Sequence, residues 1–533
     1  MTDVGDVLVS RSDIARMAGV RRPAVTNWER RHPDFPAPVT QDEGGTEPDA
    51  FRAGEVLEWL SGRTIPSNAL QPGEPAGTTY GDRFRSALRG GPSGSLLPAV
   101  EQLAWRDADR LRGRLRMSDY VNLLLSLVFV QSEERERWAQ YVEHPGLALM
   151  DLDMADGYGL TLLSDVVRFL DHSPPASRDE SRQAFDRLLA LLRDTDATAA
   201  DEFFTPPSVS RVMARALTGG GPTAKRLHDP FCRSGELLAG YLDAVVERGG
   251  TAPDEVSGRG TGEAALRLAR MNLRLRGVAR PHIRLGSRAP SQGPSDPPGS
   301  FDAVITNPPF AIRVDNAVSP PEYWWYGVTR DGDFDWLQYV VSRLAPGGRA
   351  AVLMPAGASF RSGAVGRARA RMVEDGVVEC VMALPSQLFE LTRIQTHVWF
   401  LRSPRGRSEE VLFVDGSGLG RMAGRNRRSL SDGDVDRLVH AYASWRQARE
   451  AGRDHAGTPG ISRVVDPEEI AALDYRVDPP VLVHGDARMD AAAVDPAAAR
   501  RRLAQLSEEL GRLGVQARAA DSALEERLRR YGL

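Results

Sequence analysis

Cysteine, long apolar runs and an excess of either charge are all lacking in this sequence. Its 533 residues include two cysteines, Cys232 and Cys380, which excludes a disulfide framework or a cysteine-rich zinc cluster and suits a reducing cytoplasm. The longest apolar run, residues 121–130, is about half of the ~20 residues that a membrane-spanning helix needs. The first residues carry acids where a secretory signal has a basic start and an apolar stretch. We therefore expect a cytoplasmic protein without membrane contact.

The composition is that of a large globular protein. The 68 Lys and Arg residues against 72 Asp and Glu residues leave a formal net charge of −4, so nucleic-acid contact must come from local patches. Hydrophobic residues make up 41% and charged residues 26%, which provides enough apolar surface for several cores. At roughly 150 residues per domain, the length allows about three to four compact units.

Residues 1–62 have the pattern of a winged helix-turn-helix module. Residues 10–18 and 23–31 are predicted to form two helices across a tight turn, and residues 35–39 and 51–60 resemble the wing and third helix of excisionase-like modules. The second helix carries residue types that reach DNA bases and phosphates in the major groove: Thr26, Asn27, Arg30 and Arg31. We predict that these four contact DNA. The alternative is a helical cap for protein interaction whose arginines face solvent.

The rest of the chain divides into five parts. Residues 63–95 are rich in Pro, Gly and Ser and predict a flexible linker, whereas the apolar spacing in residues 96–200 predicts a helical bundle. In residues 201–405, short apolar runs alternate with helical stretches, which predicts an α/β fold with a doubly wound parallel sheet. Residues 406–495 predict an α+β extension, and residues 496–533 predict a C-terminal helix.

The apolar residues of this last helix recur at alternating steps of three and four. The spacing is typical of a coiled coil or helical hairpin. It predicts a docking arm for a specificity subunit or for a second copy of the chain. A helix packed on its own chain is an equally compatible interpretation.

The most informative motif is Asn307-Pro308-Pro309-Phe310, which directly follows the predicted strand 301–306. Doubly wound sheets place their sites at strand ends. The Asn307 side-chain oxygen and the next backbone oxygen can each accept an N–H of an aromatic amine, which aims the nitrogen lone pair. The prolines stiffen the loop, and Phe310 offers a face to a planar base. The motif predicts a receptor for a planar amine; the alternative is a chance Asn-Pro turn.

With its neighbours, this motif resembles the N6-adenine DNA methyltransferases, specifically the modification subunit of type I restriction–modification systems. The segments that carry the resemblance are residues 105–113, 201–209, 229–238, 266–277, 301–310, 333–357 and 384–401. The resemblance covers roughly residues 94 to 533. It implies a helical domain followed by a Rossmann-like catalytic domain, S-adenosylmethionine as cofactor and double-stranded DNA as substrate, with no metal.

The resemblance also implies roles for individual residues. The loop from Asn307 to Phe310 would hold an adenine that is swung out of the duplex. The methionine end of the cofactor would lie along Phe204, Thr205 and Pro206. The turn after the first strand, where close backbone approach requires small residues, would contribute Asp229, Pro230, Ser234 and Gly235.

The sequence departs from the family's pattern at three places on the cofactor side. Arg233 stands where the turn usually has glycine. Gly260 aligns with the acid that binds the ribose hydroxyls, and Glu263 is the nearest substitute. Ser287 stands in the segment where the family has a polar residue beside the adenine ring of the cofactor, and no Asp or Asn follows it promptly. These departures motivate a second hypothesis, a methylase-fold DNA-binding scaffold or regulator with weak or absent catalysis. A third, N-methylation of a protein glutamine, shares the loop but fits poorly with a DNA-binding head.

Several other residues have structural interpretations. Trp324, Trp325 and Tyr326 are predicted to be core rather than a base-stacking surface, and His397 a packing histidine. Asp201 and Glu202 can start a helix as N-terminal acids. Four arginines occur close together after the predicted sheet: Arg421, Arg425, Arg427 and Arg428. Such a run can bind phosphates, but it is more typical of a solvent-exposed loop. The leading hypothesis is an adenine N6 DNA methyltransferase fused to a winged module.

Overall fold

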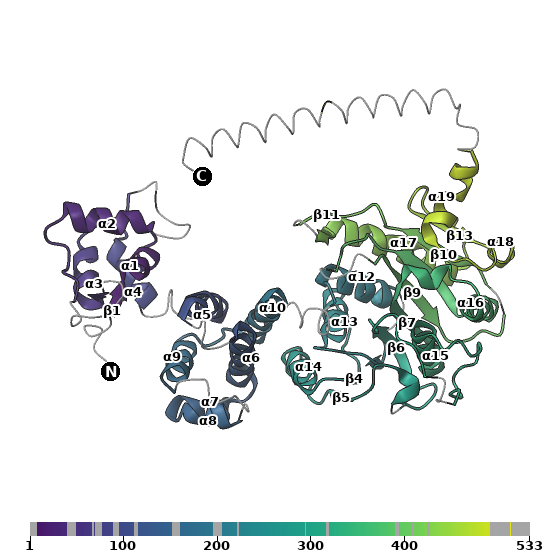
Figure 1. Cartoon of the computed structure of the whole chain (residues 1–533), viewed down its shortest axis with the longest axis horizontal. Helices are drawn as coiled ribbons and strands as arrows, with labels where there is room; N and C mark the ends of the chain where they lie inside the picture. Colours follow the sequence, from purple (N-terminus) through teal and green to yellow (C-terminus); the bar gives the residue numbers. More distant parts are fainter. Residues whose placement is uncertain are drawn as a thin grey trace.

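The computed structural model describes most of the chain. The described residues are 8–39, 50–66, 69, 77–88, 95–110, 116–151, 160–195, 205–220, 223–293, 295–315, 319–389, 394–407, 409–423, 427–490 and 512. Figure 1 shows a small N-terminal group of helices, a set of helices in the middle of the sequence, and a large α/β region. The predicted C-terminal helix, residues 496–533, lies outside the described residues apart from Arg512.

The described residues of the N-terminal module form two short strands and four helices. Its elements are β1 (Leu8–Ser10), α1 (Arg11–Met17), α2 (Arg22–Arg31), β2 (Ala50–Arg52), α3 (Ala53–Ser61) and α4 (Tyr80–Leu88). The two strands pair antiparallel. Ile14, Val25, Phe51, Trp59 and Phe84 are among the residues of one shared apolar core. Helix α2 therefore has its apolar side on this core and its polar side toward solvent.

Helix α4 lies inside the segment that the sequence predicts to be a linker. Its Phe84 is fully buried in the core of the N-terminal module, and the Tyr80 ring lies 5.3 Å from the Trp28 ring. A Cβ on Gly81 would come within 2.5 Å of the Ser61 backbone, so glycine permits this close contact. Two aromatic residues four positions apart share one helix face. Because Pro and Gly residues surround this short pattern, the sequence predicts a linker instead of a helix.

The described residues of the middle region form six helices. They are α5 (Leu96–Arg110), α6 (Met117–Glu133), α7 (Arg135–Glu143), α8 (Gly146–Asp151), α9 (Leu160–Asp171) and α10 (Arg178–Thr195). Helix α6 is central and buried around most of its circumference. The apolar core of these helices includes Leu268, Met271 and Leu275, which belong to a helix of the α/β region. The two regions are therefore packed together.

The α/β region is built on a nine-stranded sheet. In chain order the strands are β3 (Arg226–Asp229), β4 (Glu255–Gly260), β5 (His282–Leu285), β6 (Phe301–Thr306), β7 (Leu344–Pro355), β8 (Val378–Ala383), β9 (Thr396–Arg402), β10 (Val411–Asp415) and β13 (Ser462–Val465). Their order across the sheet is β13-β10-β8-β9-β7-β6-β3-β4-β5.

Helices cover both faces of this sheet (Figure 1). One core contains residues of α12 (Pro207–Thr218), α13 (Glu236–Glu247), α14 (Glu263–Leu275) and α17 (Asp432–Glu450). The core on the other face contains residues of α15 (Gly332–Arg343), α16 (Ala364–Glu374), α18 (Pro467–Ala472) and α19 (Pro479–Asp490). Smaller elements are the 3-10 turns η3 (Pro290–Gln292) and η4 (Ala356–Ser359) and the hairpin of β11 (Arg421–Met422) and β12 (Arg428–Ser429).

Two features of the sheet differ from the sequence-based prediction. The sheet is mixed, because β9 runs antiparallel to β7 and β8, and β13 runs antiparallel to β10. The sheet also continues past residue 405, since β10 and β13 belong to it. Every residue of β9 is buried, and a strand that is buried on both faces has no alternation that would reveal its direction. Direction is decided by pairing instead.

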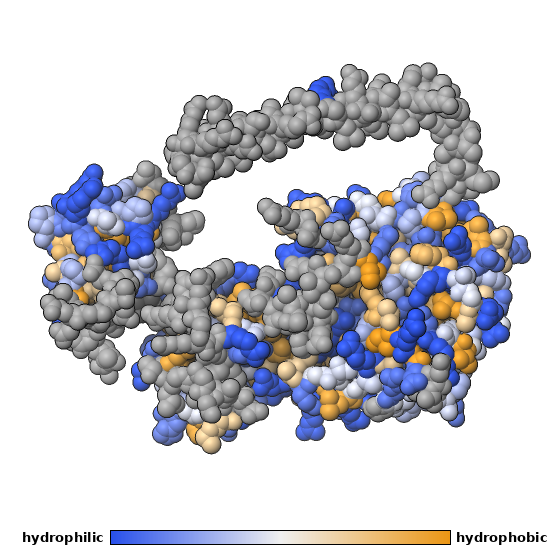
Figure 2. All heavy atoms as spheres, viewed as in Figure 1, coloured by the Kyte–Doolittle hydropathy of each residue, from blue (hydrophilic) through white to orange (hydrophobic). Residues whose placement is uncertain are grey.

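The visible surface of the described residues is mainly hydrophilic, with hydrophobic side chains scattered among charged ones (Figure 2). Within the described part of the chain, none of the helices combines the length and the apolar character that crossing a bilayer demands.

Candidate active site

The loops that carry most predicted site residues meet at one edge of the sheet. Strands β4, β3, β6 and β7 are neighbours and run parallel, so their carboxyl ends lie side by side. Residues 230–235 follow β3, residues 261–262 follow β4, and residues 307–311 follow β6. The prediction that these segments lie at strand ends agrees with this arrangement.

Asn307 is buried at this edge of the sheet. It directly follows β6 and is 3% exposed. Its Nδ2 donates a hydrogen bond to the Thr205 Oγ1 at 3.1 Å, which joins residues that are 102 positions apart in sequence. None of the described residues donates a hydrogen bond to its Oδ1. The amide is therefore anchored through its nitrogen, and its oxygen is left to accept a hydrogen bond.

The loop after Asn307 is held from its far end. Pro308 is buried and Phe310 is half-buried against the core. Ala311 has a left-handed backbone (φ 58°), and its N–H donates to the Asp333 Oδ1 at 3.2 Å. Arg361 in turn lies 2.5 Å from the other oxygen of Asp333. The sequence reasoning gave Asp333 no role, although it begins the segment 333–357 that carries the family resemblance.

Asp229 ends strand β3 as a buried carboxyl. Its Oδ1 accepts a hydrogen bond from the Phe231 N–H at 2.9 Å, while Oδ2 accepts no hydrogen bond of normal geometry from the described residues. Burial raises the pKa of Asp229 to about 7, against the opposing effect of the Thr306 hydroxyl and the Phe231 N–H. A buried acceptor with raised pKa is suited to a ligand that brings a donor or a positive charge.

The turn between β3 and α13 accommodates Arg233. The residue has φ 46°, so its backbone takes the left-handed conformation that a glycine adopts easily. Its guanidinium carbon lies 5.4 Å from the centre of the Phe231 ring. Gly235 has φ 77°, and a Cβ there would lie 3.2 Å from the Ala269 backbone, so this glycine allows α13 and α14 to approach closely.

Glu236, the first residue of α13, also belongs to the site although the sequence reasoning missed it. Its Oε1 accepts the Thr205 backbone N–H at 2.8 Å, and its Oε2 accepts the Ser234 hydroxyl at 2.9 Å. Burial raises its pKa, and the nearby Arg233 charge opposes that rise. An acid at the start of a helix is common, so the sequence offered no signal that its carboxylate reaches Thr205.

The residues predicted for the nucleoside end of a cofactor follow the neighbouring strands β4 and β5, and the Gly286 N–H donates to the Gly260 carbonyl at 2.8 Å. Gly260 ends β4, and a Cβ there would lie 2.8 Å from a methyl of Leu266. Glu263 is exposed and lies 3.7 Å from Arg270. The Ser287 hydroxyl donates to the Ala289 carbonyl. The residues predicted to hold the methionine end include the buried acceptor of Asp229 and the close-packed turn at Gly235. They fit S-adenosylmethionine better than the residues predicted to hold its nucleoside end.

Other predicted residues are placed as follows. Phe204, Asp201 and Glu202 lie outside the described residues. Pro206 is half-buried before α12, and Pro230 is buried after β3. In the aromatic cluster, Trp324 and Tyr326 are buried as predicted, whereas Trp325 is 50% exposed.

His397 is buried in β9. Its Nδ1 lies 2.8 Å from the Ser359 Oγ, and burial lowers its pKa to about 4. The neutral ring is thus a packing histidine, as the sequence predicts.

The basic residues predicted to meet DNA are on two elements. On α2 the predicted residues Thr26, Asn27, Arg30 and Arg31 are all exposed, and Arg30 donates to the Asn27 Oδ1 at 3.1 Å. Arg421 is exposed on the β11–β12 hairpin, where Arg427 and Arg428 are partly exposed; Arg425 lies outside the described residues. The hairpin follows β10, which is parallel to β8, so it extends from the same edge of the sheet as the Asn307 loop.

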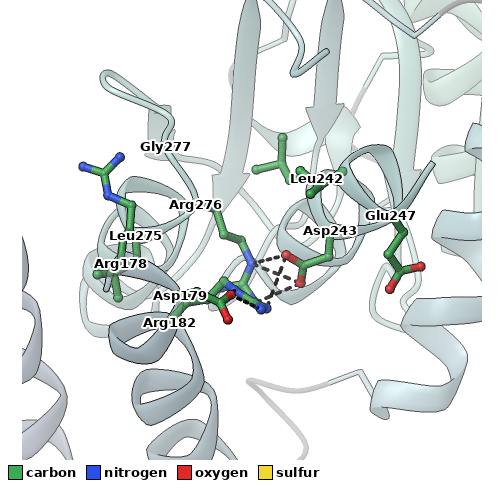
Figure 3. A pocket seen from close by; sticks show the side chains of 10 residues that line it. Arg178, Asp179, Arg182, Leu242, Asp243, Glu247, Leu275, Arg276 and Gly277 are labelled. Atoms are coloured by element: carbon green, nitrogen blue, oxygen red, sulfur yellow. Dashed lines mark hydrogen bonds and ion pairs between the residues drawn. The ribbon is translucent and has the colours of Figure 1, made fainter. Parts of the chain in front are cut away.

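A cavity of about 400 Å³ lies elsewhere, between the start of α10 and the C-terminal ends of α13 and α14. Figure 3 shows Arg276 pointing into it and paired with Asp243. Arg276 also pairs with Asp186 at 2.8 Å. Helices α13 and α14 start at the carboxyl edge of the sheet, so the cavity lies toward the opposite edge and belongs to the interface with the middle helices. No group of His, Cys, Asp or Glu suited to a metal ion occurs among the described residues.

Comparisons with known proteins agree with this arrangement. The N-6 DNA methylase family matches residues 176–490, which is more than half of the chain. A type I restriction enzyme methylase subunit (HindI) of Haemophilus influenzae is 25% identical over 57% of this chain and 68% of its own length. The MjaIX methylase subunit of Methanocaldococcus jannaschii is 24% identical over 72% of this chain and 84% of its own length.

Solved structures share the fold. The methyltransferase subunit of a type I restriction–modification system from Streptococcus thermophilus superposes with a TM-score of 0.60 at 21% identity. The likeness covers 72% of this chain and 98% of that one. It supports an α/β methyltransferase fold with a mixed sheet.

Proposed function

This chain belongs to the N-6 DNA methylase family, and on that premise we propose that it transfers a methyl group to N6 of adenine in duplex DNA, as the modification subunit of a type I restriction–modification system. The observation that carries the proposal is the amide of Asn307. It lies at the end of β6, is anchored through its nitrogen and keeps its oxygen available.

The loop is suited to activate an aromatic amine. The Asn307 Oδ1 and the Pro308 carbonyl each accept one N–H of the adenine N6, which localises the nitrogen lone pair and aims it. Phe310 provides a ring face for the base. Because the amine is inaccessible inside the stack, the adenine must leave the duplex before the loop can hold it. Rigid placement of the acceptors supplies the rate enhancement.

S-adenosylmethionine is the proposed methyl donor, and it supplies an electrophilic methyl group when bound. Asp229 would accept its ammonium group, and Thr205, Ser234 and Gly235 would line its methionine end. Phe204, Pro206 and Pro230 stay proposed members of this set. Glu263 and Ser287 remain candidates for the nucleoside end, although their described contacts point to other partners.

We further propose that DNA contacts extend beyond the catalytic loop. The α2 residues Thr26, Asn27, Arg30 and Arg31 would read or position DNA from the N-terminal module. The relatives are methylase subunits of type I restriction enzymes. A specificity subunit is therefore the proposed partner, docking on the segment 496–533.

The substitution Asn307→Ala tests the proposed function. We expect wild-type protein, supplied with its specificity partner, to transfer labelled methyl groups to adenine, and the Asn307→Ala variant to lose transfer by at least about 100-fold. Product is measured as N6-methyladenine by mass spectrometry of digested DNA. Calorimetry with S-adenosylmethionine serves as the control, because both proteins should bind it. Equal, background-level methylation by both would contradict the proposal.

A further inference from the structure

We propose that Glu236 is a positioning residue that orients the catalytic amide of Asn307 through Thr205. The inference rests on the proposed methyl transfer, in which the Asn307 oxygen must face the substrate amine. It concerns a residue that neither the loop motif nor the spacing of the glycine-rich turn indicates.

The contacts form a continuous chain from α13 to the loop after β6. The Glu236 Oε1 accepts the backbone N–H of Thr205 at 2.8 Å, and the Thr205 Oγ1 accepts the Asn307 Nδ2 at 3.1 Å. Thr205 is 2% exposed and Asn307 is 3% exposed, so water does not compete freely for either bond. Three segments that are far apart in sequence are thus joined at one edge of the sheet.

The direction of the Asn307 amide decides whether the loop can bind an amine. With Nδ2 held by Thr205, Oδ1 is the atom that remains to accept a hydrogen bond. If the amide turned by 180°, it would present N–H groups to the N–H groups of the substrate, and donor would face donor. The hydrogen bond that the Thr205 hydroxyl accepts from Nδ2 holds the amide in the orientation that leaves Oδ1 available.

Glu236 in turn fixes the position of Thr205. Thr205 precedes α12 and is not part of a helix or strand, so its N–H has no partner within a regular element. The carboxylate of Glu236 accepts this N–H with one oxygen and the Ser234 hydroxyl with the other. Its place in the first turn of α13 offsets part of the cost of burying a charge there. A shorter side chain at this position would leave the Thr205 N–H without an acceptor.

The test uses the full-length protein in the same complex as the methylation assay. Glu236→Ala removes the acceptor and Thr205→Val removes the hydroxyl at nearly constant shape. We expect each to lower kcat by about 10- to 100-fold, and Glu236→Ala to leave KM for S-adenosylmethionine and DNA little changed, because misplacement of a reacting group acts on the chemical step. Glu236→Gln keeps one acceptor for Thr205 and should retain most of the wild-type kcat.

A double-mutant cycle tests whether Glu236 and Thr205 act through one chain of contacts or independently of each other. If Glu236 acts through Thr205, the double variant Glu236→Ala with Thr205→Val should be no slower than the slower single variant. Multiplication of the two losses would contradict the proposal. A higher KM for the cofactor with unchanged kcat in Glu236→Ala would also contradict it, because Glu236 would then be a cofactor-binding residue.

A spectroscopic measurement tests the contacts without activity. The sequence has seven asparagines, so selective 15N labelling of asparagine yields few side-chain amide signals, and Asn307→Ala identifies one of them. We expect Glu236→Ala and Thr205→Val to move or broaden that signal, while Glu236→Gln leaves it in place. An unchanged signal in Glu236→Ala would overturn the role given to Glu236, whether or not the wild type methylates DNA. Absence of methylation in the wild type would contradict the proposed function instead.

Discussion

Burial makes the protonation of the Asp229 carboxyl depend on pH near neutrality. Its pKa is raised to about 7, chiefly by burial, with the Glu236 charge adding to the rise and the Arg233 charge opposing it. Below about pH 7 the carboxyl is therefore largely protonated and neutral. A cationic ligand favours the ionised form, so its binding must pull the proton off.

This linkage predicts that affinity for S-adenosylmethionine falls as the pH falls below 7. On the proposed contact, the loss should approach tenfold for each pH unit, because the proton would compete with the ammonium group for the Asp229 carboxylate. Calorimetric titrations between pH 5.5 and pH 7 measure it, a range in which an α-amino group stays protonated. The matched control is Asp229→Asn, which should bind weakly with little pH dependence over this range. A wild-type affinity that does not change with pH would contradict the prediction.

The same residue should affect stability with a defined sign. A carboxyl whose pKa is higher in the folded than in the unfolded protein favours folding most when it is protonated. Its contribution to the free energy of unfolding is present below about pH 4 and is lost as the pH rises to about 7. In Asp229→Asn this part of the pH dependence should be absent, which urea unfolding at pH 5 and pH 7 can measure.

The β11–β12 hairpin carries arginines and is a separate two-stranded sheet beside the large sheet. It follows β10 at the edge of the sheet that holds the Asn307 loop, and the Arg428 N–H donates to the Gln387 carbonyl at 2.8 Å. Strand β10 is four positions from β6 in the sheet, which at ~4.8 Å per strand is roughly 19 Å. That offset corresponds to about six base pairs of duplex at 3.4 Å each. On the proposed function, a duplex held along this edge would bring phosphates beyond the extruded base to the hairpin.

We expect the substitution Arg421→Glu to weaken DNA binding several-fold at low salt and to reduce the steepness of its salt dependence, because a phosphate contact releases counterions. Fluorescence anisotropy with labelled duplex at several salt concentrations measures both. Arg453→Glu is the control: Arg453 is also exposed, but it follows the C-terminal end of α17, toward the opposite edge of the sheet. Equal effects of the two substitutions would argue for a diffuse field rather than a local contact.

At the scale of the whole molecule, the middle helices and the α/β region are joined by apolar packing and by Arg276. The Arg276 side chain is 6% exposed and pairs with Asp186 of α10 and with Asp243 of α13 (Figure 3 shows the latter pair). One buried guanidinium thus connects a middle helix to two helices of the α/β region. Its position beside the apolar contacts of α14 keeps the two regions in one orientation.

Removing this guanidinium should destabilise the interface. We expect Arg276→Met to lower the free energy of unfolding by about 3 kcal/mol, because it leaves partly buried carboxylates without their partner. Arg187→Met is the control, since Arg187 is 54% exposed and pairs with Glu101 on the surface. That pair should contribute less than about 1 kcal/mol. Urea unfolding followed by tryptophan fluorescence measures both, and equal losses would contradict the role given to Arg276.

Residue types and their local pattern predict both the chemistry of the loop after β6 and the α/β class of the fold. Asn307 to Phe310 follow an apolar run, and both the acceptor groups and the stiffness of the prolines are local properties that residue types specify. The alternation of apolar strands and helices likewise specifies an α/β region. Short-range patterns of this kind need no knowledge of which segments meet.

The tertiary structure alone decided which distant residues complete the site. Thr205 meets Asn307 across 102 positions, Glu236 turns toward Thr205, and the antiparallel β9 enters between β7 and β8. Local sequence cannot specify these contacts, because a buried strand looks the same in either direction and an acid at a helix start is ordinary. The contacts of Thr205 and Glu236 follow from the packing of α12 and α13 on one sheet, which is a property of the whole folded chain.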